Sequence, residues 1–92
     1  MLTDKRGVSY ARLLVTHPRT GPQAVYDTPR RARVTAPTYA GDTVTLDLDV
    51  TGRAPGMLCV EQRDPDWGVW RAWVPIDACE PLATHEVIEP RR

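Results

Sequence analysis

Nine prolines and six glycines are spread along the 92 residues, and they limit what this chain can fold into. They leave no amphipathic helical stretch of ten or more residues, because proline and glycine both oppose helix formation. What remains is a series of short runs separated by turn signals at regular spacing, which is typical of a β-sandwich or barrel. We therefore predict a single all-β domain over residues 1–92. Its core is expected in about residues 8–83, with polar tails at both ends.

Two runs with strict alternation of polar and apolar residues predict a first hairpin. Residues 42–51 alternate without a break, residues 31–36 do the same, and residues 37–42 can turn the chain between them. One register places four aliphatic side chains in the core and two Arg–Asp pairs on the other face. The inner pairs are Val34 with Leu46 and Ala36 with Val44, and the outer pairs are Arg33 with Asp47 and Arg31 with Asp49. A slip of one residue would put the aspartates in the core, so this register is firmly specified.

A second hairpin is predicted over residues 57–62 and 69–74, joined by a turn at residues 63–68. Pairing Val60 with Ala72 gives one apolar face and one mixed face. The inner side chains are Leu58, Val60, Trp70, Ala72 and Val74; on the outer face Glu61 lies opposite Arg71, and Cys59 lies beside Trp73.

Three further segments complete the expected sheet. The run Val8–Thr16 is predicted as the first strand, and residues 24–26 form either a short strand or part of a long loop that ends at Pro29. Residues 80–89 are a candidate last edge strand, anchored by Val87 and Ile88.

The stretch Trp70-Arg71-Ala72-Trp73-Val74-Pro75-Ile76-Asp77-Ala78-Cys79 resembles the end of an SH3-like barrel. In that superfold a strand ending in an aliphatic residue and proline enters one 3-10 turn, and a short strand follows. The resemblance covers about residues 30–83 and implies five to six antiparallel strands, a turn at 76–78 and a closing strand at 79–82. The aromatic pocket of peptide-binding SH3 domains is missing, because Met57-Leu58 stands in place of a Trp pair and Ala78 in place of a Tyr. The resemblance therefore implies the fold without recognition of PxxP motifs.

The net charge of the chain does not favour one class of binding partner over another. The formal net charge is zero, although residues 1–46 carry seven basic and three acidic side chains (+4) and residues 47–92 carry five and nine (−4). Eleven of the twelve basic residues are arginine, a bias typical of GC-rich genomes such as those of actinobacteria and their phages. We find no leader-like or membrane-spanning segment, and expect a cytoplasmic or virion-associated protein that is neither secreted nor transmembrane.

The inventory of reactive side chains predicts neither an enzyme nor a metal or cofactor site. Ser9 is the only serine, and no nucleophile motif surrounds it. Four residues could ligate zinc, but their spacing contains no paired motif. They are Cys59, Cys79, His17 and His85. We expect buried thiols, paired or not, and surface imidazoles.

Two binding functions remain. Arg30, Arg31 and Arg33 form a basic cluster that could contact nucleic acid, but the predicted pairs with Asp49 and Asp47 would neutralise two of the three. A nucleic-acid-associated barrel is thus the second hypothesis.

The leading hypothesis is a non-catalytic protein-interaction or assembly module, acting by partner binding or self-association. Exposed tryptophan is enriched at interfaces, and Trp67 is expected at a hairpin tip and Trp73 on an outer face. The predicted partner-binding residues are Trp67, Trp73, Met57, Asp64 and Asp66. The genomic style suggests a phage connector or capsid-associated component, and an accessory regulator of a host protein is a further alternative.

Overall fold

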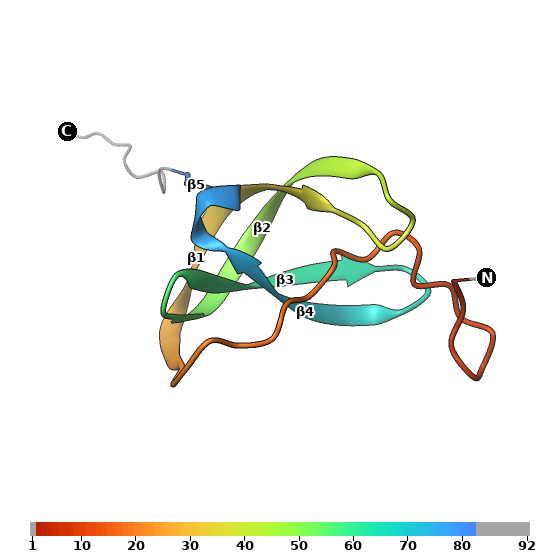
Figure 1. Cartoon of the computed structure of the whole chain (residues 1–92), viewed down its shortest axis with the longest axis horizontal. Coiled ribbons are helices and arrows are strands. Elements are labelled where there is room, and N and C mark those ends of the chain that lie inside the picture. The colour runs from red at the N-terminus through yellow and green to blue at the C-terminus, as the bar shows by residue number, and fades with distance from the viewer. Residues whose placement is uncertain (1, 83–92) are drawn as a thin grey trace.

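The computed structural model describes residues 2–82 and contains one antiparallel sheet with a single 3-10 turn (Figure 1). The elements are β1 (Ala24–Pro37), β2 (Thr43–Ala54), β3 (Met57–Asp64), β4 (Gly68–Pro75), η1 (Ile76–Ala78) and β5 (Cys79–Pro81). The strand order is β4-β3-β2-β1-β5. The prediction of an all-β fold with five to six antiparallel strands and one short 3-10 turn is confirmed, with five strands in the described residues.

Both predicted hairpins form in the predicted registers. β1 and β2 pair Val34 with Leu46 and Arg33 with Asp47. β3 and β4 pair Val60 with Ala72, and the turn between them has a glycine, Gly68, at φ +97°. Alternation along each strand thus fixed which side chains face the core.

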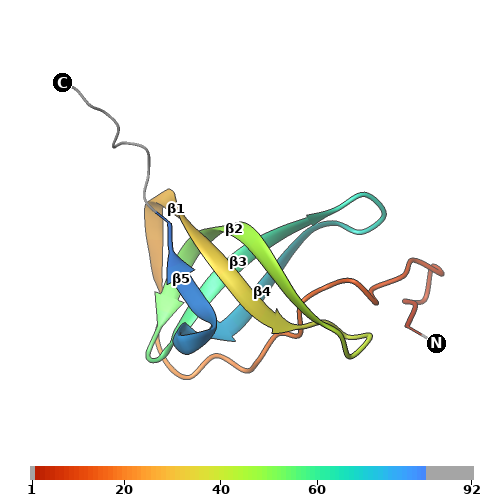
Figure 2. The same cartoon turned by 90° about the horizontal axis from the view of Figure 1, so that it is seen from above.

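The sheet coils strongly without closing (Figure 2). β4 and β5 are its two edges, and the strands curl so that their apolar faces meet in a barrel-like shape. The central cluster consists of Leu14, Ala32, Val34, Ala36, Leu48, Val50, Val60, Ala72 and Val74. Four strands and one residue from the N-terminal segment therefore build the core.

The predicted strand Val8–Thr16 is wrong, because this segment joins no ladder of the sheet. It forms an N-terminal arm, residues 8–17, which turns at residues 11–13 and then runs beside the free edge of β4 over residues 14–17 (Figure 1). The backbone amide of Val15 donates to the Pro37 carbonyl at the end of β1, and that of His17 donates to the Trp73 carbonyl in β4. The arm therefore bridges the two sides of the gap in the barrel through scattered contacts.

Side chains take the place of ladder bonds along the arm. The amide of Leu14 donates to the side-chain carbonyl of Gln62, and the Gln62 amide nitrogen donates to the Arg12 carbonyl. Leu13 and Leu14 are fully buried. Their apolar side chains drive docking, while the buried Gln62 satisfies the backbone that has left the sheet.

β1 begins at Ala24, so residues 24–26 belong to a strand rather than to a loop. The pairing with β2 is interrupted between Val25 and Arg30, where residues 26–29 form a bulge. Gly52 makes the close approach at this point possible, because a Cβ there would lie 2.9 Å from the Ala24 carbonyl oxygen. The bulge moves Tyr26 to one end of the barrel.

β5 follows η1 and pairs with β1 through Cys79, Glu80 and Pro81. This agrees with the predicted turn at 76–78 and with a short strand after it. The strand ends at Pro81, however, and does not close the sheet into the predicted barrel. The larger part of the candidate edge strand at residues 80–89, including its anchors Val87 and Ile88, lies outside the described residues.

Candidate protein-interaction surfaces

The five predicted partner-binding residues lie in three separate places. Trp67, Asp64 and Asp66 lie at the β3–β4 turn, Trp73 lies on the outer face of β4, and Met57 lies at the opposite end of the barrel beside the β2–β3 turn. They therefore do not form one surface.

Trp67 belongs to an aromatic cluster at the end of the barrel that carries the β3–β4 turn. Its ring is 5.6 Å from that of Trp70 and 6.5 Å from that of Tyr10, and Tyr39 lies 6.2 Å from Trp70. All these contacts are edge-to-face, the favoured geometry for aromatic pairs. The Arg6 guanidinium lies 5.9 Å from the centroid of the Trp67 ring. Trp67 is half-buried, folded back over the hairpin tip rather than projecting from it.

Asp64 organises the turn that carries Trp67. Its carboxylate accepts hydrogen bonds from the backbone amides of Trp67 and Asp66, and it forms an ion pair with Arg12 of the arm at 3.1 Å. The amide of Trp67 makes the largest contribution to lowering the pKa of Asp64, followed by the amide of Asp66 and the charge of Arg12. The Asp64 side chain is 5% exposed, so its carboxylate makes these bonds within the molecule rather than at a free surface.

The arginine cluster divides as the register predicts. Arg31 and Arg33 form ion pairs with Asp49 and Asp47 at 3.0 and 2.9 Å. The hydrogen bond from Arg33 is the main cause of the lowered pKa of Asp47. Arg30 instead lies over the ring of Tyr26 at 4.4 Å, a cation–π contact.

The outer face of the sheet carries charges that neutralise one another across the strands. Glu61 of β3 pairs with both Arg71 of β4 and Arg63, and Asp49 of the neighbouring strand pairs with Arg31. The sheet face therefore has little net charge to attract a charged ligand.

Trp73 is half-buried, and the arm is hydrogen-bonded to its backbone. Its backbone amide donates to the Thr16 hydroxyl. Cys59, which faces Trp73 across β3 and β4, is 8% exposed. Cys59 and Cys79 are both free thiols, and burial raises the pKa of Cys79.

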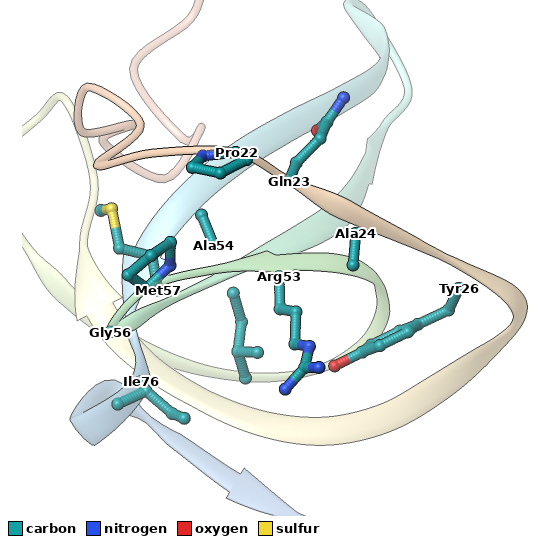
Figure 3. Close-up of a pocket in the computed structure, with 11 residues that line it drawn as sticks. Pro22, Gln23, Ala24, Tyr26, Arg53, Ala54, Gly56, Met57 and Ile76 are labelled. Carbon is teal, nitrogen blue, oxygen red and sulfur yellow. The ribbon is translucent and has the colours of Figure 1, made fainter.

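A groove opens at the end of the barrel opposite the aromatic cluster. It has a volume of 530 Å³ and lies between the start of β1, the β2–β3 turn and η1 (Figure 3). The lining residues that matter most are Tyr26, Arg53, Met57, Leu58 and Ile76. The exposure expected for Met57 is not found, because its side chain is only 7% exposed although it is one of the residues that line the groove.

A smaller cavity of 270 Å³ continues the groove toward β5. It shares Tyr26, Leu58 and Ile76 with the larger one and reaches Cys79 and Pro81. Ile76 is 51% exposed at the point where the two meet. Together they form a continuous depression, which we call the terminal groove.

The rim of the terminal groove is basic. Arg53 and Arg30 line it, and neither forms an ion pair with any other residue of the 2–82 segment. Asp27 and Asp77 lie in the neighbouring bulge and turn, but they do not line the groove. An apolar floor with unpaired guanidinium groups can bind aliphatic side chains flanked by carboxylates.

The groove brings together residues that sequence reasoning did not single out. Tyr26 lies in the segment for which the sequence leaves a strand and a loop open, and the predicted partner-binding residues include neither Arg53 nor Ile76. The exposed isoleucine directly after Pro75 was the available signal, because a large aliphatic residue in a short turn has little core to enter.

No cluster of three or more potential metal ligands is found among residues 2–82, and that segment has no helix long and apolar enough to cross a membrane. The sequence matches no protein-family model, and comparisons with curated proteins and with solved structures gave no match.

Proposed function

We propose that this chain is a non-catalytic protein-interaction module, built on an SH3-like small barrel, that binds an extended protein segment in the terminal groove. The segment would carry aliphatic side chains for the floor and carboxylates for the arginine rim. The order β4, η1 and β5 supports the SH3-like assignment, and the arginine-rich composition supports a phage assembly component as its setting.

One observation carries the proposal: residues 2–82 leave uncovered an apolar groove that has a half-exposed isoleucine in its lining. Ile76 is 51% exposed and lines this groove. Isolated exposed aliphatic residues are common, but Ile76 adjoins a concave surface with Tyr26 and Leu58. Such concave apolar surfaces with a few polar groups are typical binding sites.

The charges favour a protein partner over a nucleic acid. Two of the three clustered arginines are neutralised by Asp47 and Asp49, so they would release few counterions on binding phosphates. Arg30 and Arg53 remain, and two guanidinium groups suit individual carboxylates better than a phosphate backbone.

The test is an NMR titration of the full chain with a synthetic ten-residue peptide of alternating glutamate and valine. A peptide with lysine in place of glutamate, and the oligonucleotide dT10, are titrated in parallel. We expect shifts confined to Tyr26, Arg53, Leu58 and Ile76, and only for the acidic peptide.

Ile76→Glu should weaken binding of the acidic peptide by at least about tenfold, because it places a carboxylate in the apolar floor. Val69→Glu is the matched control: Val69 is 46% exposed and lies near the other end of β4, so binding should be unchanged. Equal binding of the lysine peptide, a response to dT10 alone, or equal losses in both variants would contradict the proposal.

A further inference from the structure

The two cavities of the terminal groove each have in their lining one arginine that the other lacks. Arg53 lines the larger cavity and Arg30 lines the smaller one. Three mainly apolar side chains line both cavities and therefore form the boundary between them: Tyr26, Leu58 and Ile76. We call these three residues the saddle. The groove thus consists of an apolar saddle with one guanidinium group in the cavity on each side of it.

A bulge in β1 places Arg30 against the saddle. The pairing of β1 with β2 is interrupted at residues 26–29, and β2 has only Thr51 in the same interval. In a regular strand Tyr26 and Arg30 would be about 13 Å apart. The bulge instead brings the Arg30 guanidinium carbon over the Tyr26 ring, 4.4 Å from its centroid. This cation–π contact holds Arg30 at the edge of the smaller cavity.

Arg53 reaches the saddle from the larger cavity. It lies near the end of β2 and pairs with Ala24 of β1, before the bulge begins. Figure 3 shows its side chain extending toward the hydroxyl end of Tyr26. Because Arg30 lies over the face of the same ring, the two guanidinium groups adjoin different parts of Tyr26.

Both cavities offer a positive charge that is not already neutralised. No acidic side chain from residues 2–82 lines either cavity. Arg31 also lines the smaller cavity, but its guanidinium is bound to Asp49 at 3.0 Å. Arg30 and Arg53 form no ion pair within the same segment. A carboxylate of a ligand can therefore bind each of them without displacing a carboxylate of that segment.

From this geometry we propose that the terminal groove has two separate carboxylate subsites, one at Arg53 and one at Arg30, on either side of the saddle. The groove then selects a protein segment in which aliphatic side chains lie between two carboxylates, rather than any acidic segment. This inference rests on the proposed function of the groove and specifies the partner that the groove takes.

Peptides with one or two carboxylates test the two subsites. The probes are ten-residue peptides with two glutamates separated by one, two or three valines, and with serine at the other positions. The tightest binder is then compared with the same peptide in which either glutamate is replaced by glutamine. Dissociation constants are measured by NMR titration of the full chain, of Arg30→Gln and of Arg53→Gln.

The second glutamate should tighten binding to the unmodified chain by about three- to fivefold, the upper part of the range for one exposed ion pair. The side-chain Nε–H signals of Arg30 and Arg53 should both shift with the two-glutamate peptide. In Arg30→Gln and in Arg53→Gln the gain should fall to about twofold or less, because one arginine then remains to bind either carboxylate.

Arg19→Gln is the matched control for these two variants. Arg19 lines neither cavity, so the second glutamate should keep its full effect in this variant. A gain that persists in Arg30→Gln and Arg53→Gln as well would show general attraction between charges and would overturn the inference.

Two substitutions of Tyr26 test its role as a positioning residue. Tyr26→Phe keeps the ring and should keep the full gain from the second glutamate. Tyr26→Ala removes the ring that holds Arg30, so the gain should fall to that of Arg30→Gln. Loss of the gain in Tyr26→Phe would assign one carboxylate to the tyrosine hydroxyl and would overturn the pair of arginine subsites.

The same titrations separate this inference from the proposed function. If one- and two-glutamate peptides bind the unmodified chain equally well, the groove has a single anion site. The inference is then overturned, while the binding function stands. If no peptide of the series binds, both the inference and the proposed function fail.

Discussion

The two ends of this small barrel both carry large aromatic or aliphatic side chains, but only one end packs them against one another. At the aromatic end, Trp67, Trp70 and two tyrosines pack against one another, and Asp64 ties the hairpin tip to the arm. At the groove end, Tyr26 has no aromatic neighbour and Ile76 stays half exposed. The first end uses its large side chains inside the molecule, whereas the second leaves them at the surface.

The difference follows from which segment covers each end. The N-terminal arm supplies Tyr10 and Arg12 to the aromatic end and satisfies the backbone through Gln62. At the groove end the segment before β1 contacts the β2–β3 turn, where the Thr20 hydroxyl donates to the Pro55 carbonyl. The open sheet is thus stabilised at the aromatic end, where the N-terminal arm covers it. At the groove end, where residues 2–82 leave it uncovered, it offers a candidate binding site.

The largest effect on stability is expected for Leu14→Ala in the N-terminal arm. Leu14 is fully buried and touches the central cluster, so the substitution leaves a cavity in the core. We expect the free energy of unfolding to fall by about 2–5 kcal/mol, as measured by urea denaturation. A loss below about 1 kcal/mol would show that the arm is dispensable to the core.

Trp67→Ala should come next. The substitution removes two edge-to-face contacts, each worth about 0.5–1.5 kcal/mol beyond area burial, so a loss of about 1–3 kcal/mol is expected. The measurement is urea denaturation with Tyr10→Leu as the companion variant. If stability is unchanged while a partner is lost, Trp67 is an interface residue, as its position at the hairpin tip first indicated.

Lowering the pH should weaken the aromatic end before the groove end. The folded state lowers the pKa of Asp64, so this carboxylate stabilises the fold above its unfolded pKa and ceases to do so as the pH falls through its folded value. Hydrogen exchange between pH 5 and pH 2.5 should show faster opening around Trp67 than around Ile76. Asp64→Asn should flatten that pH dependence, and an equally steep profile in the variant would contradict the assignment.

The smallest effect on stability is expected for Ile76→Ser. Half of this side chain is already exposed, and η1 contains no buried residue, so the free energy of unfolding should change by no more than about 0.5 kcal/mol. Thermal unfolding measures it against Val69→Ser as control. A clear loss would place Ile76 in the core and remove the basis for a binding groove.

Much of the sheet could be predicted from the sequence, because alternation is a local property of the chain. The run from Thr43 to Val50 and its partner around Val34 can pair in only one register without burying aspartates. The same logic predicted that Arg31 and Arg33 would be neutralised. The candidate site was less accessible, since Met57, Trp67 and Trp73 were chosen by residue type and lie far apart in the fold.

The sequence by itself determined the class of fold, the two hairpins and the 3-10 turn after Pro75. These features depend on period-two patterning and on proline and glycine, which act over a few residues. Only the tertiary structure decided that the N-terminal arm bridges the gap in the barrel and that Trp67 folds back over the hairpin tip. It also decided that Tyr26, Arg53 and Ile76 line one groove. Those outcomes depend on how the sheet coils and on which segments reach its open edges, and contacts between residues distant in the chain leave no periodic signal.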